Sequence, residues 1–246
     1  MKGGVAVMMR LLQSTRPTWC NLIGIFYDRE EGPFADNGLD LLLPMLPKID
    51  QAVVLEPTCN QIQAGCVGSM HATLTFRGRR AHSARPWQGD NAYYKMIPAL
   101  TFLQNFQRRE VVVGGLPFYE VMSATQLSSQ NPANAVPECV ALNVNYRFAP
   151  GRTKEQAWAE MESAFASCAE LELREFAPAG EVSVDYPPLQ AWISRSQLVL
   201  EAKQAWTDVA RLTAAGIPAF NFGPGDPAQA HQADEFVSIA ALENCY

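Results

Sequence analysis

The stretch His71-Ala72-Thr73-Leu74-Thr75-Phe76-Arg77 marks a change of character in the chain. Its apolar side chains alternate with polar ones, which is the two-residue period of a strand with one exposed face. The same alternation recurs at residues 140–148, and helical patterns cover residues 90–106 and 153–169. Together these signals predict an α+β module with an antiparallel layer of strands.

The flanking parts of the chain carry the signals of an α/β domain. Residues 22–27, 52–55 and 218–222 are short apolar runs of the kind that lie buried in a parallel sheet. Helices are expected at residues 5–12, 37–45 and 194–205. The sequence therefore predicts an α/β domain, made of residues 1–66 and 181–246, that is interrupted by an inserted module of residues 67–180.

Charge and cysteine content exclude several classes of protein. The 246 residues carry a net charge of −6, and nucleic-acid binding requires clustered Lys and Arg. The densest basic group, Arg77, Arg79, Arg80 and Arg85, is interpreted as a solvated strand end. Six scattered cysteines form no C-x-x-C pair, which favours reduced thiols and a cytoplasmic location. No apolar stretch approaches the roughly 20 residues that span a bilayer, so no membrane association is expected.

Four residues follow predicted strands of the α/β domain. Glu30 and Glu31 come after residues 22–27, Glu56 after residues 52–55, and His231 after a glycine-rich loop. Ligands of open α/β sheets bind beyond the carboxyl ends of the strands, where these side chains could converge. Carboxylates and imidazole suit zinc, and a neighbouring carboxylate can act as a general base. Taken alone, glutamates such as Glu30, Glu31 and Glu56 are far more often solvated than catalytic, and a histidine such as His231 is as often a loop residue as a ligand.

Three further candidates lie in the inserted module. His82 is either a loop histidine in a turn closed by proline or a donor that stabilises an oxyanion. Asn134 is usually a turn residue and Arg147 a surface charge, but either could instead hold a substrate carboxylate, which Arg binds with two parallel hydrogen bonds.

Six short motifs in this order resemble the dinuclear zinc deacylases and exopeptidases, a family that includes succinyl-diaminopimelate desuccinylase, acetylornithine deacetylase and carboxypeptidase G. They are Met1-Lys2-Gly3-Gly4, Asp28-Arg29-Glu30-Glu31-Gly32, Glu56-Pro57-Thr58, residues 78–85, Asn134-Ala135-Val136-Pro137, and residues 223–231. The resemblance covers essentially the whole chain. It implies a zinc-peptidase-like α/β catalytic domain and an inserted ferredoxin-like lid through which two subunits form a homodimer.

The resemblance also implies a role for each candidate. Glu30 would be the general base, Glu31 and His231 would bind one zinc ion, and Glu56 would bind a second. His82 would reach the active site of the opposite subunit, and Asn134 and Arg147 would bind substrate. The implied reaction converts N-succinyl-LL-2,6-diaminopimelate to succinate and LL-2,6-diaminopimelate, with cobalt as an alternative metal.

One family feature is expected to lie upstream of the first residue. Family members carry a His-x-Asp motif and a bridging Asp before the Met-Lys-x-Gly turn, where this sequence begins. We therefore expect the catalytic domain to be incomplete at its N-terminus and the 246-residue chain to retain zinc poorly and to show little or no activity. A version with the upstream segment restored is expected to hydrolyse N-succinyl substrates. Two alternatives stay open: a deacylase for acetylornithine or another N-acyl amino acid, and a non-catalytic homodimerising module.

Overall fold

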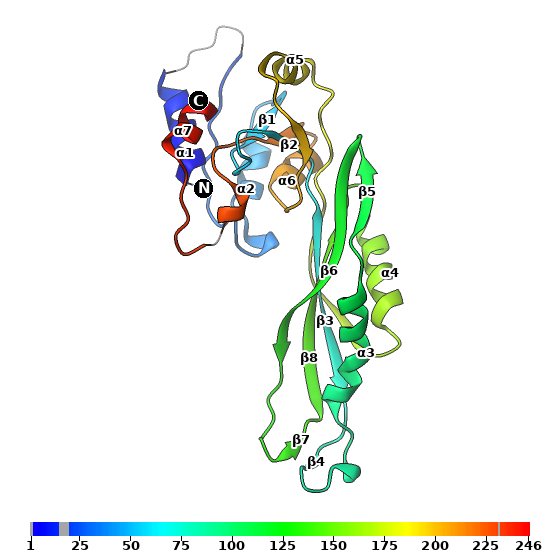
Figure 1. Ribbon diagram of the computed structural model, residues 1–246. Coiled ribbons are helices and arrows are strands. Elements are labelled where there is room, and N and C mark those ends of the chain that lie inside the picture. Colours follow the sequence, from blue (N-terminus) through cyan, green and yellow to red (C-terminus); the bar gives the residue numbers. More distant parts are fainter. Residues whose placement is uncertain (1, 15–19, 231) are drawn as a thin grey trace. The chain divides into compact units, whose positions relative to one another are not determined.

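The computed structural model describes residues 2–14, 20–230 and 232–246 (Figure 1). The chain forms two compact units, the first comprising Met1–Cys66, Val112–Pro117 and Gly180–Tyr246, and the second comprising Val67–Val111 and Phe118–Ala179. The sequence predicts boundaries at 66/67 and 180/181. That these pieces act as a catalytic domain and a lid stays a prediction.

The first unit is built on a mixed four-stranded sheet. Its strands lie in the order β1 (Ala52–Val54), β11 (Ala219–Asn221), β2 (Ile62–Ala64) and β10 (Leu200–Ala202). The β1–β11 and β2–β10 pairs are parallel, whereas β11 and β2 run antiparallel. The helices of this unit are α1 (Lys2–Ser14), η1 (Phe34–Asp36), α2 (Leu39–Leu42), η2 (Leu43–Met45), α5 (Pro187–Ser196), α6 (Val209–Ala214), η4 (Pro227–Gln229) and α7 (Ile239–Cys245).

Two apolar clusters hold this unit together. One joins α2 and α6 to the sheet through Leu39, Val209 and Ala219, and the other joins α5 to the sheet through Leu189 and Phe220. All five side chains are at most 3% exposed. Burying a side chain of this size contributes about 1.5–3 kcal/mol, so these contacts fix the short strands despite their few ladder bonds.

Two sequence predictions for this unit are wrong. Residues 22–27 form no strand, and Leu22 and Phe26 are about half exposed, at 46% and 52%. A short apolar run does not itself tell a buried strand from an irregular segment that packs on one side. The helix predicted over residues 194–205 ends at Ser196, because Gln197 adopts a left-handed conformation with φ of 54°.

The second unit contains a five-stranded antiparallel sheet covered on one face by two helices (Figure 1). The strand order is β5 (Arg109–Val113), β6 (Leu116–Ser128), β8 (Cys139–Phe148), β3 (Gly68–Arg77) and β9 (Glu170–Ala177). The tip of the hairpin between β5 and β6, Val112–Pro117, belongs to the first compact unit. A separate pair joins β4 (Ala81–His82) to β7 (Ala135–Val136). The helices are η3 (Pro86–Gln88), α3 (Ala92–Asn105) and α4 (Lys154–Phe165).

Strand alternation explains the layering of this unit. The apolar residues of β3 and β8 point toward α3 and α4, where they form one buried core, while their polar neighbours face the other side. Helix α4 begins at Thr153, whose hydroxyl accepts from the Gln156 amide while the Gln156 side chain caps the Thr153 N–H. The predicted α/β fold with an inserted α+β module is thus confirmed.

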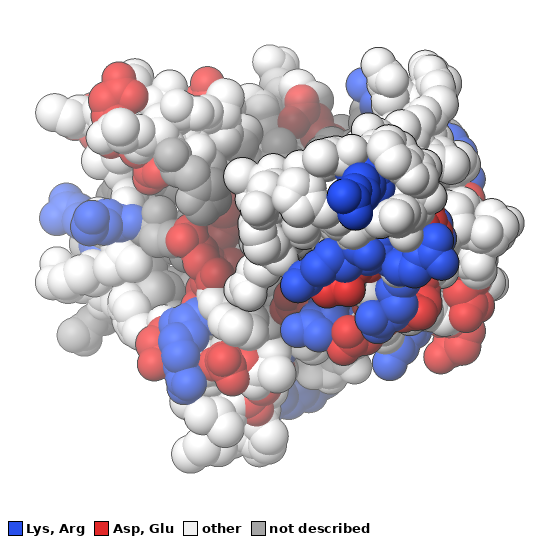
Figure 2. Space-filling model, turned by 90° about the horizontal axis from the view of Figure 1, so that it is seen from below, with Lys and Arg blue, Asp and Glu red and all other residues white. Residues whose placement is uncertain are grey.

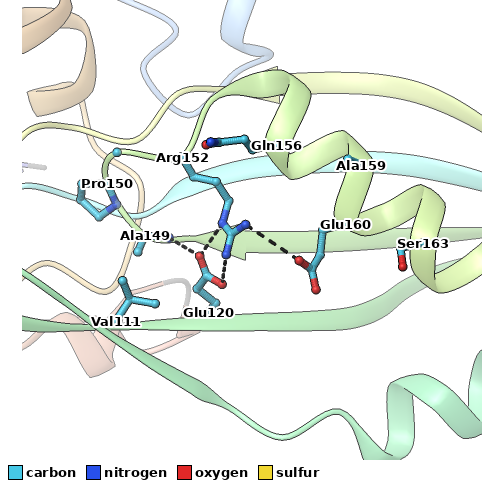
Figure 3. A pocket seen from close by; sticks show the side chains of 10 residues that line it. Val111, Glu120, Ala149, Pro150, Arg152, Gln156, Ala159, Glu160 and Ser163 are labelled. Atoms are coloured by element: carbon cyan, nitrogen blue, oxygen red, sulfur yellow. Dashed lines mark hydrogen bonds and ion pairs between the residues drawn. The ribbon is translucent and has the colours of Figure 1, made fainter.

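A buried carboxylate joins the sheet to α4. Glu120 on β6 is 1% exposed and accepts hydrogen bonds from Arg152, at 2.8 Å to each oxygen, and from the Ala149 N–H (Figure 3). Burial alone would raise the pKa of Glu120, but these hydrogen bonds hold it below its usual value. Arg152 and Glu160 line the same open pocket of about 610 Å³. Because the positive charge of Arg152 is neutralised by Glu120 and Glu160, we interpret this pocket as a structural feature and not as a ligand-binding site.

Basic side chains of the second unit are largely paired. Arg77 binds Glu170 at 2.9 Å and Arg80 binds Glu138 at 2.6 Å. Figure 2 shows Lys and Arg interleaved with Asp and Glu on the face in view.

In the part of the chain that the structure describes, no helix combines the length and apolarity needed to cross a membrane.

Candidate functional site

The loop that carries Glu30 and Glu31 is a tight turn. We call residues 28–31 the acidic loop. Arg29 has a φ of 57°, a conformation uncommon for a residue other than glycine, and the Gly32 N–H donates to its carbonyl oxygen at 3.2 Å. Since such backbone strain persists only where surrounding contacts impose it, the turn must be held from both sides.

Asp208 provides this support. The Tyr27 hydroxyl donates to Asp208 Oδ2 at 2.6 Å, and Asn37 Nδ2 donates to Asp208 Oδ1 at 3.1 Å. Tyr27 precedes the acidic loop and Asn37 follows it, so one carboxylate anchors both ends of the segment. Burial and the charge of Asp208 raise the pKa of Tyr27 well above its usual value, which keeps its hydroxyl protonated as a donor.

Arg211 neutralises this buried carboxylate. Asp208 is 1% exposed and Arg211 is 4% exposed, and Arg211 Nε lies 2.9 Å from Asp208 Oδ1. Arg211 also pairs with Asp40 and donates to the carbonyl oxygen of Phe34, whose ring its guanidinium covers at 3.8 Å. The arginine thus ties α6 to the segment that follows the acidic loop.

Glu56 lies just beyond the carboxyl end of β1, where two glycines allow close packing. A Cβ on Gly4 of α1 would lie 2.5 Å from the Leu55 carbonyl oxygen, and one on Gly223 would collide with the Glu56 carbonyl oxygen. Thr58 fixes the turn from the other side, because its hydroxyl accepts from the Gly223 N–H at 3.0 Å. Glycine at positions 4 and 223 is therefore a steric requirement for placing Glu56.

The carboxylates of this unit influence each other electrostatically. Burial, followed by the charges of Glu56, Asp208 and Glu31, raises the pKa of Glu30 to about 7. Burial also raises the pKa of Glu56, while nearby Lys203 opposes that rise. Glu30, Glu31 and Glu56, which lie on segments distant in sequence, thus form a concentration of negative charge in the first unit.

No sequence pattern points to Lys203 as a site residue. It follows β10, is 5% exposed, and its Nζ donates to the Pro57 carbonyl oxygen at 3.4 Å. Burial lowers the pKa of Lys203 and the charge of Glu56 opposes that shift. The sequence does not single out Asp208 either, because its partners Tyr27 and Asn37 lie 181 and 171 positions away along the chain.

The donor chemistry of these residues fits a divalent cation. Carboxylates that raise each other's pKa gain stability from a nearby positive charge, and carboxylate oxygens are accepted ligands for zinc. His231 lies outside the described residues. Among the residues that are described, no three His, Cys, Asp or Glu side chains form a group able to hold a metal by themselves.

The β4–β7 pair brings His82 and Asn134 together in the second unit. His82 is paired with Ala135, and the Ser83 N–H donates to the Asn134 carbonyl oxygen at 2.9 Å. His82 Nδ1 accepts from the Ala84 N–H at 3.1 Å, so a neutral His82 carries its proton on Nε2. That tautomer presents an N–H donor beyond the loop, as stabilising an oxyanion requires.

Arg147 lies elsewhere in the second unit, on β8. It pairs with Ser69 of β3 on one side and with Val121 of β6 on the other. Its Nε donates to Asn145 Oδ1 at 2.9 Å. Arg147 thus belongs to the sheet face opposite the helices and is not part of the β4–β7 pair.

Similarity to known proteins defines the class of this chain. Residues 65–170 match the peptidase dimerisation domain of the M20 peptidases. The chain is 36% identical over 246 residues to a succinyl-diaminopimelate desuccinylase of Mycobacterium tuberculosis, which covers 98% of this chain and 70% of the relative. It is 33% identical to the Corynebacterium glutamicum enzyme of that name, covering 96% of this chain and 67% of the relative.

Solved structures agree on the fold. Aminopeptidase PepT of Bacillus cereus superposes with a TM-score of 0.71 and 17% identity, covering 99% of this chain and 67% of that one. A tripeptidase of Staphylococcus aureus gives 0.63 and 17%, covering 85% and 59%.

Fold and sequence together therefore define a hydrolase of the metallopeptidase class, one built with a dimerisation domain. Within that class, the chain belongs to the M20 family in its succinyl-diaminopimelate desuccinylase branch. Enzymes of this family depend on metal ions, generally zinc.

Proposed function

We propose that the protein hydrolyses the amide bond of N-succinyl-LL-2,6-diaminopimelate to succinate and LL-2,6-diaminopimelate, in the cytoplasm. The reaction class rests on one observation: Glu30, Glu31 and Glu56 share a negative field in the first unit although they come from separate segments. The choice of a succinyl group as the acyl group of the substrate is supported by the names of the relatives, which are succinyl-diaminopimelate desuccinylases.

Metal ions complete the proposed site. Glu31 and His231 would hold one zinc ion and Glu56 a second, with cobalt as a possible substitute. Bound zinc supplies Lewis-acid chemistry, since it lowers the pKa of water toward about 7 and polarises a carbonyl group.

Glu30 is the proposed general base. Its carboxylate takes a proton from the attacking water as the amide carbonyl carbon is attacked, and it returns the proton to the departing amine. Proton transfer by a positioned carboxylate contributes about a hundredfold to ten-thousandfold in rate. The anchors at Tyr27 and Asn37 support this role, because they hold both ends of the acidic loop.

The second unit would contribute the substrate contacts. His82 from the opposite subunit would donate from Nε2 to the oxyanion, a role that its hydrogen bond from Ala84 supports. Asn134 and Arg147 would each bind the substrate from a different part of the second unit, and the guanidinium of Arg147 is suited by geometry to a substrate carboxylate.

A side-by-side assay tests the proposed substrate. Whatever activity the zinc-saturated protein shows is expected to favour N-succinyl-LL-2,6-diaminopimelate over N-acetylornithine by tenfold to a hundredfold in kcat/KM, because the latter lacks the succinyl carboxylate. Chelation should abolish the activity, and added zinc or cobalt should restore it. Preference for N-acetylornithine would favour the alternative deacylase, and a dimer inactive at every metal concentration would favour a non-catalytic module.

We further propose that two copies associate through α3 and the distal half of β6. Residues Ser123–Ser128 pair with β8 on one side, are exposed, and include neither a charge nor a proline, whereas five-residue β5 is too short to cover thirteen-residue β6. Sheet edges without such protection readily pair with another strand. A shallow groove of about 270 Å³ beside this edge is lined by Met96, Leu100 and Leu127.

Exposed apolar side chains extend this surface. On α3, Ile97 is 53% exposed, and on β6 Leu127 is 61% exposed. The Tyr93 hydroxyl bonds to Ser129 at 2.9 Å, which links the helix to the end of the strand. An edge that pairs antiparallel with its own copy is self-complementary, as a twofold dimer requires.

Leu127→Arg is expected to convert the dimer to a monomer, with at least a hundredfold rise in the dimer dissociation constant, because it places two like charges near the twofold axis. Sedimentation equilibrium measures this constant. Leu41→Arg on α2 is the matched control, since Leu41 is also exposed, at 71%, but lies in the first unit. A Leu127→Arg protein that stays dimeric would exclude this surface.

A further inference from the structure

A row of polar side chains crosses the face of the five-stranded sheet that the helices leave uncovered. The register pairs Ser69 with Arg147, His71 with Asn145 and Thr73 with Asn143. These positions alternate with the buried core residues of β3 and β8, so their side chains share one face. The row ends at Arg147, the arginine for which we propose substrate binding.

Asn145 is the centre of this row and is only 8% exposed. Its Oδ1 accepts from Arg147 Nε at 2.9 Å, while its Nδ2 lies 3.0 Å from Ser69 Oγ and 3.2 Å from the Met70 carbonyl oxygen. The carbonyl oxygen can only accept and the guanidinium Nε can only donate, so the amide has one permitted orientation.

This orientation also fixes the tautomer of His71. Nδ2 of Asn145 lies 3.0 Å from His71 Nε2, which must therefore accept, and a neutral His71 carries its proton on Nδ1. Asn143 Nδ2 lies 3.0 Å from Nδ1, and since an amide NH2 group cannot accept, the Asn143 amide must be flipped so that its oxygen accepts the hydrogen bond from Nδ1–H. Burial lowers the pKa of His71, which agrees with a neutral ring.

We propose that Asn145, held by Ser69 and His71, is a positioning residue that aims the guanidinium of Arg147 at a carboxylate of the substrate. This inference rests on the proposed role of Arg147. Asn145 binds Arg147 through Nε, whereas a guanidinium can bind a carboxylate in parallel through its terminal nitrogens, so the two contacts use different atoms. An arginine ordered before binding loses less conformational freedom when the substrate arrives.

Asn145→Ala is expected to raise KM for the N-succinyl substrate about three- to tenfold while kcat changes less than twofold, which corresponds to the cost of ordering one long side chain. In an Arg147→Ala background the same substitution should have no further effect on KM. His71→Phe, which removes the acceptor for Asn145 Nδ2, should raise KM in the same direction and to a smaller extent. Thr75→Ala, on the same face of β3, is the control and should leave both constants unchanged.

Two outcomes separate this inference from the proposed function. If Arg147→Ala leaves KM unchanged, the substrate-binding role of Arg147 fails and the inference fails with it. If Arg147→Ala raises KM but Asn145→Ala does not, or acts equally strongly without Arg147, only the positioning role is overturned. The Nε–H resonance of Arg147, assigned by its loss in Arg147→Lys, gives a readout without substrate: faster exchange in Asn145→Ala supports the proposal, and unchanged exchange contradicts it.

Discussion

Glu30→Gln is expected to lower kcat by a hundredfold to ten-thousandfold, with little change in KM. Glutamine keeps the size of the side chain but cannot take a proton from water, and general-base catalysis contributes a rate factor of about this size. The burial of Glu30 and the carboxylates around it are preserved by the substitution. Steady-state kinetics with saturating zinc measures both constants.

Metal content distinguishes this role from metal binding. Glu30→Gln should retain the zinc content of the parent protein, whereas Glu31→Gln should lose zinc, because glutamine is a weaker ligand than carboxylate. Glu243→Gln on α7, an exposed position of the same unit, is the control. A Glu30→Gln protein that keeps more than a tenth of the parent kcat would rule out Glu30 as the base.

Arg211→Met is expected to lower the free energy of unfolding by about 3–5 kcal/mol, the cost of leaving a buried charge without its partner. The side chain of Asp208 is fully buried, at 0% exposure, and would keep only its bonds from Tyr27 and Asn37. Methionine fills similar volume, so the loss is mainly electrostatic. Urea denaturation, followed by circular dichroism, measures the change.

The exposed pair Arg174–Glu172 is a matched control. These residues lie 2.8 Å apart, with side chains 56% and 66% exposed, so Arg174→Met should cost no more than about 1 kcal/mol. The double variant Arg211→Met with Asp208→Asn should be more stable than Arg211→Met alone, since it removes the unpaired charge. Equal effects of Arg211→Met and Arg174→Met would contradict the assigned importance of the buried pair.

Local patterns predict the second unit better than the first. The alternation at residues 71–77 and 140–148 corresponds to β3 and β8, because one face of that sheet is buried against helices and the other is not. The first unit has strands of three residues, too short for any period to appear. The irregular path of residues 22–27 depends on tertiary contacts. The end of helix α5 depends on the left-handed backbone conformation of Gln197.

The residues of the candidate site likewise fall into two groups, those that local sequence patterns predict and those that they do not. The sequence predicts Glu30, Glu31 and Glu56 because acidic residues after apolar runs suit the rim of a sheet, and the structure gives them a common electrostatic environment. Asp208, Arg211 and Lys203 were not assigned a role. Their importance comes from burial and from partners far away in sequence, which no local spacing records.

The hydrogen-bonded bridge between Cys66 and Gly180 has an architectural consequence. The two residues exchange backbone hydrogen bonds of 3.2 and 3.0 Å, although 114 positions separate them along the chain. The polypeptide therefore departs and returns at neighbouring points, so joining these points by a short turn would close the first unit, apart from the hairpin tip Val112–Pro117, without stretching its backbone. Such a geometry lets a whole cassette be gained, exchanged or deleted during evolution at little entropic penalty, and it marks where a protein engineer would cut.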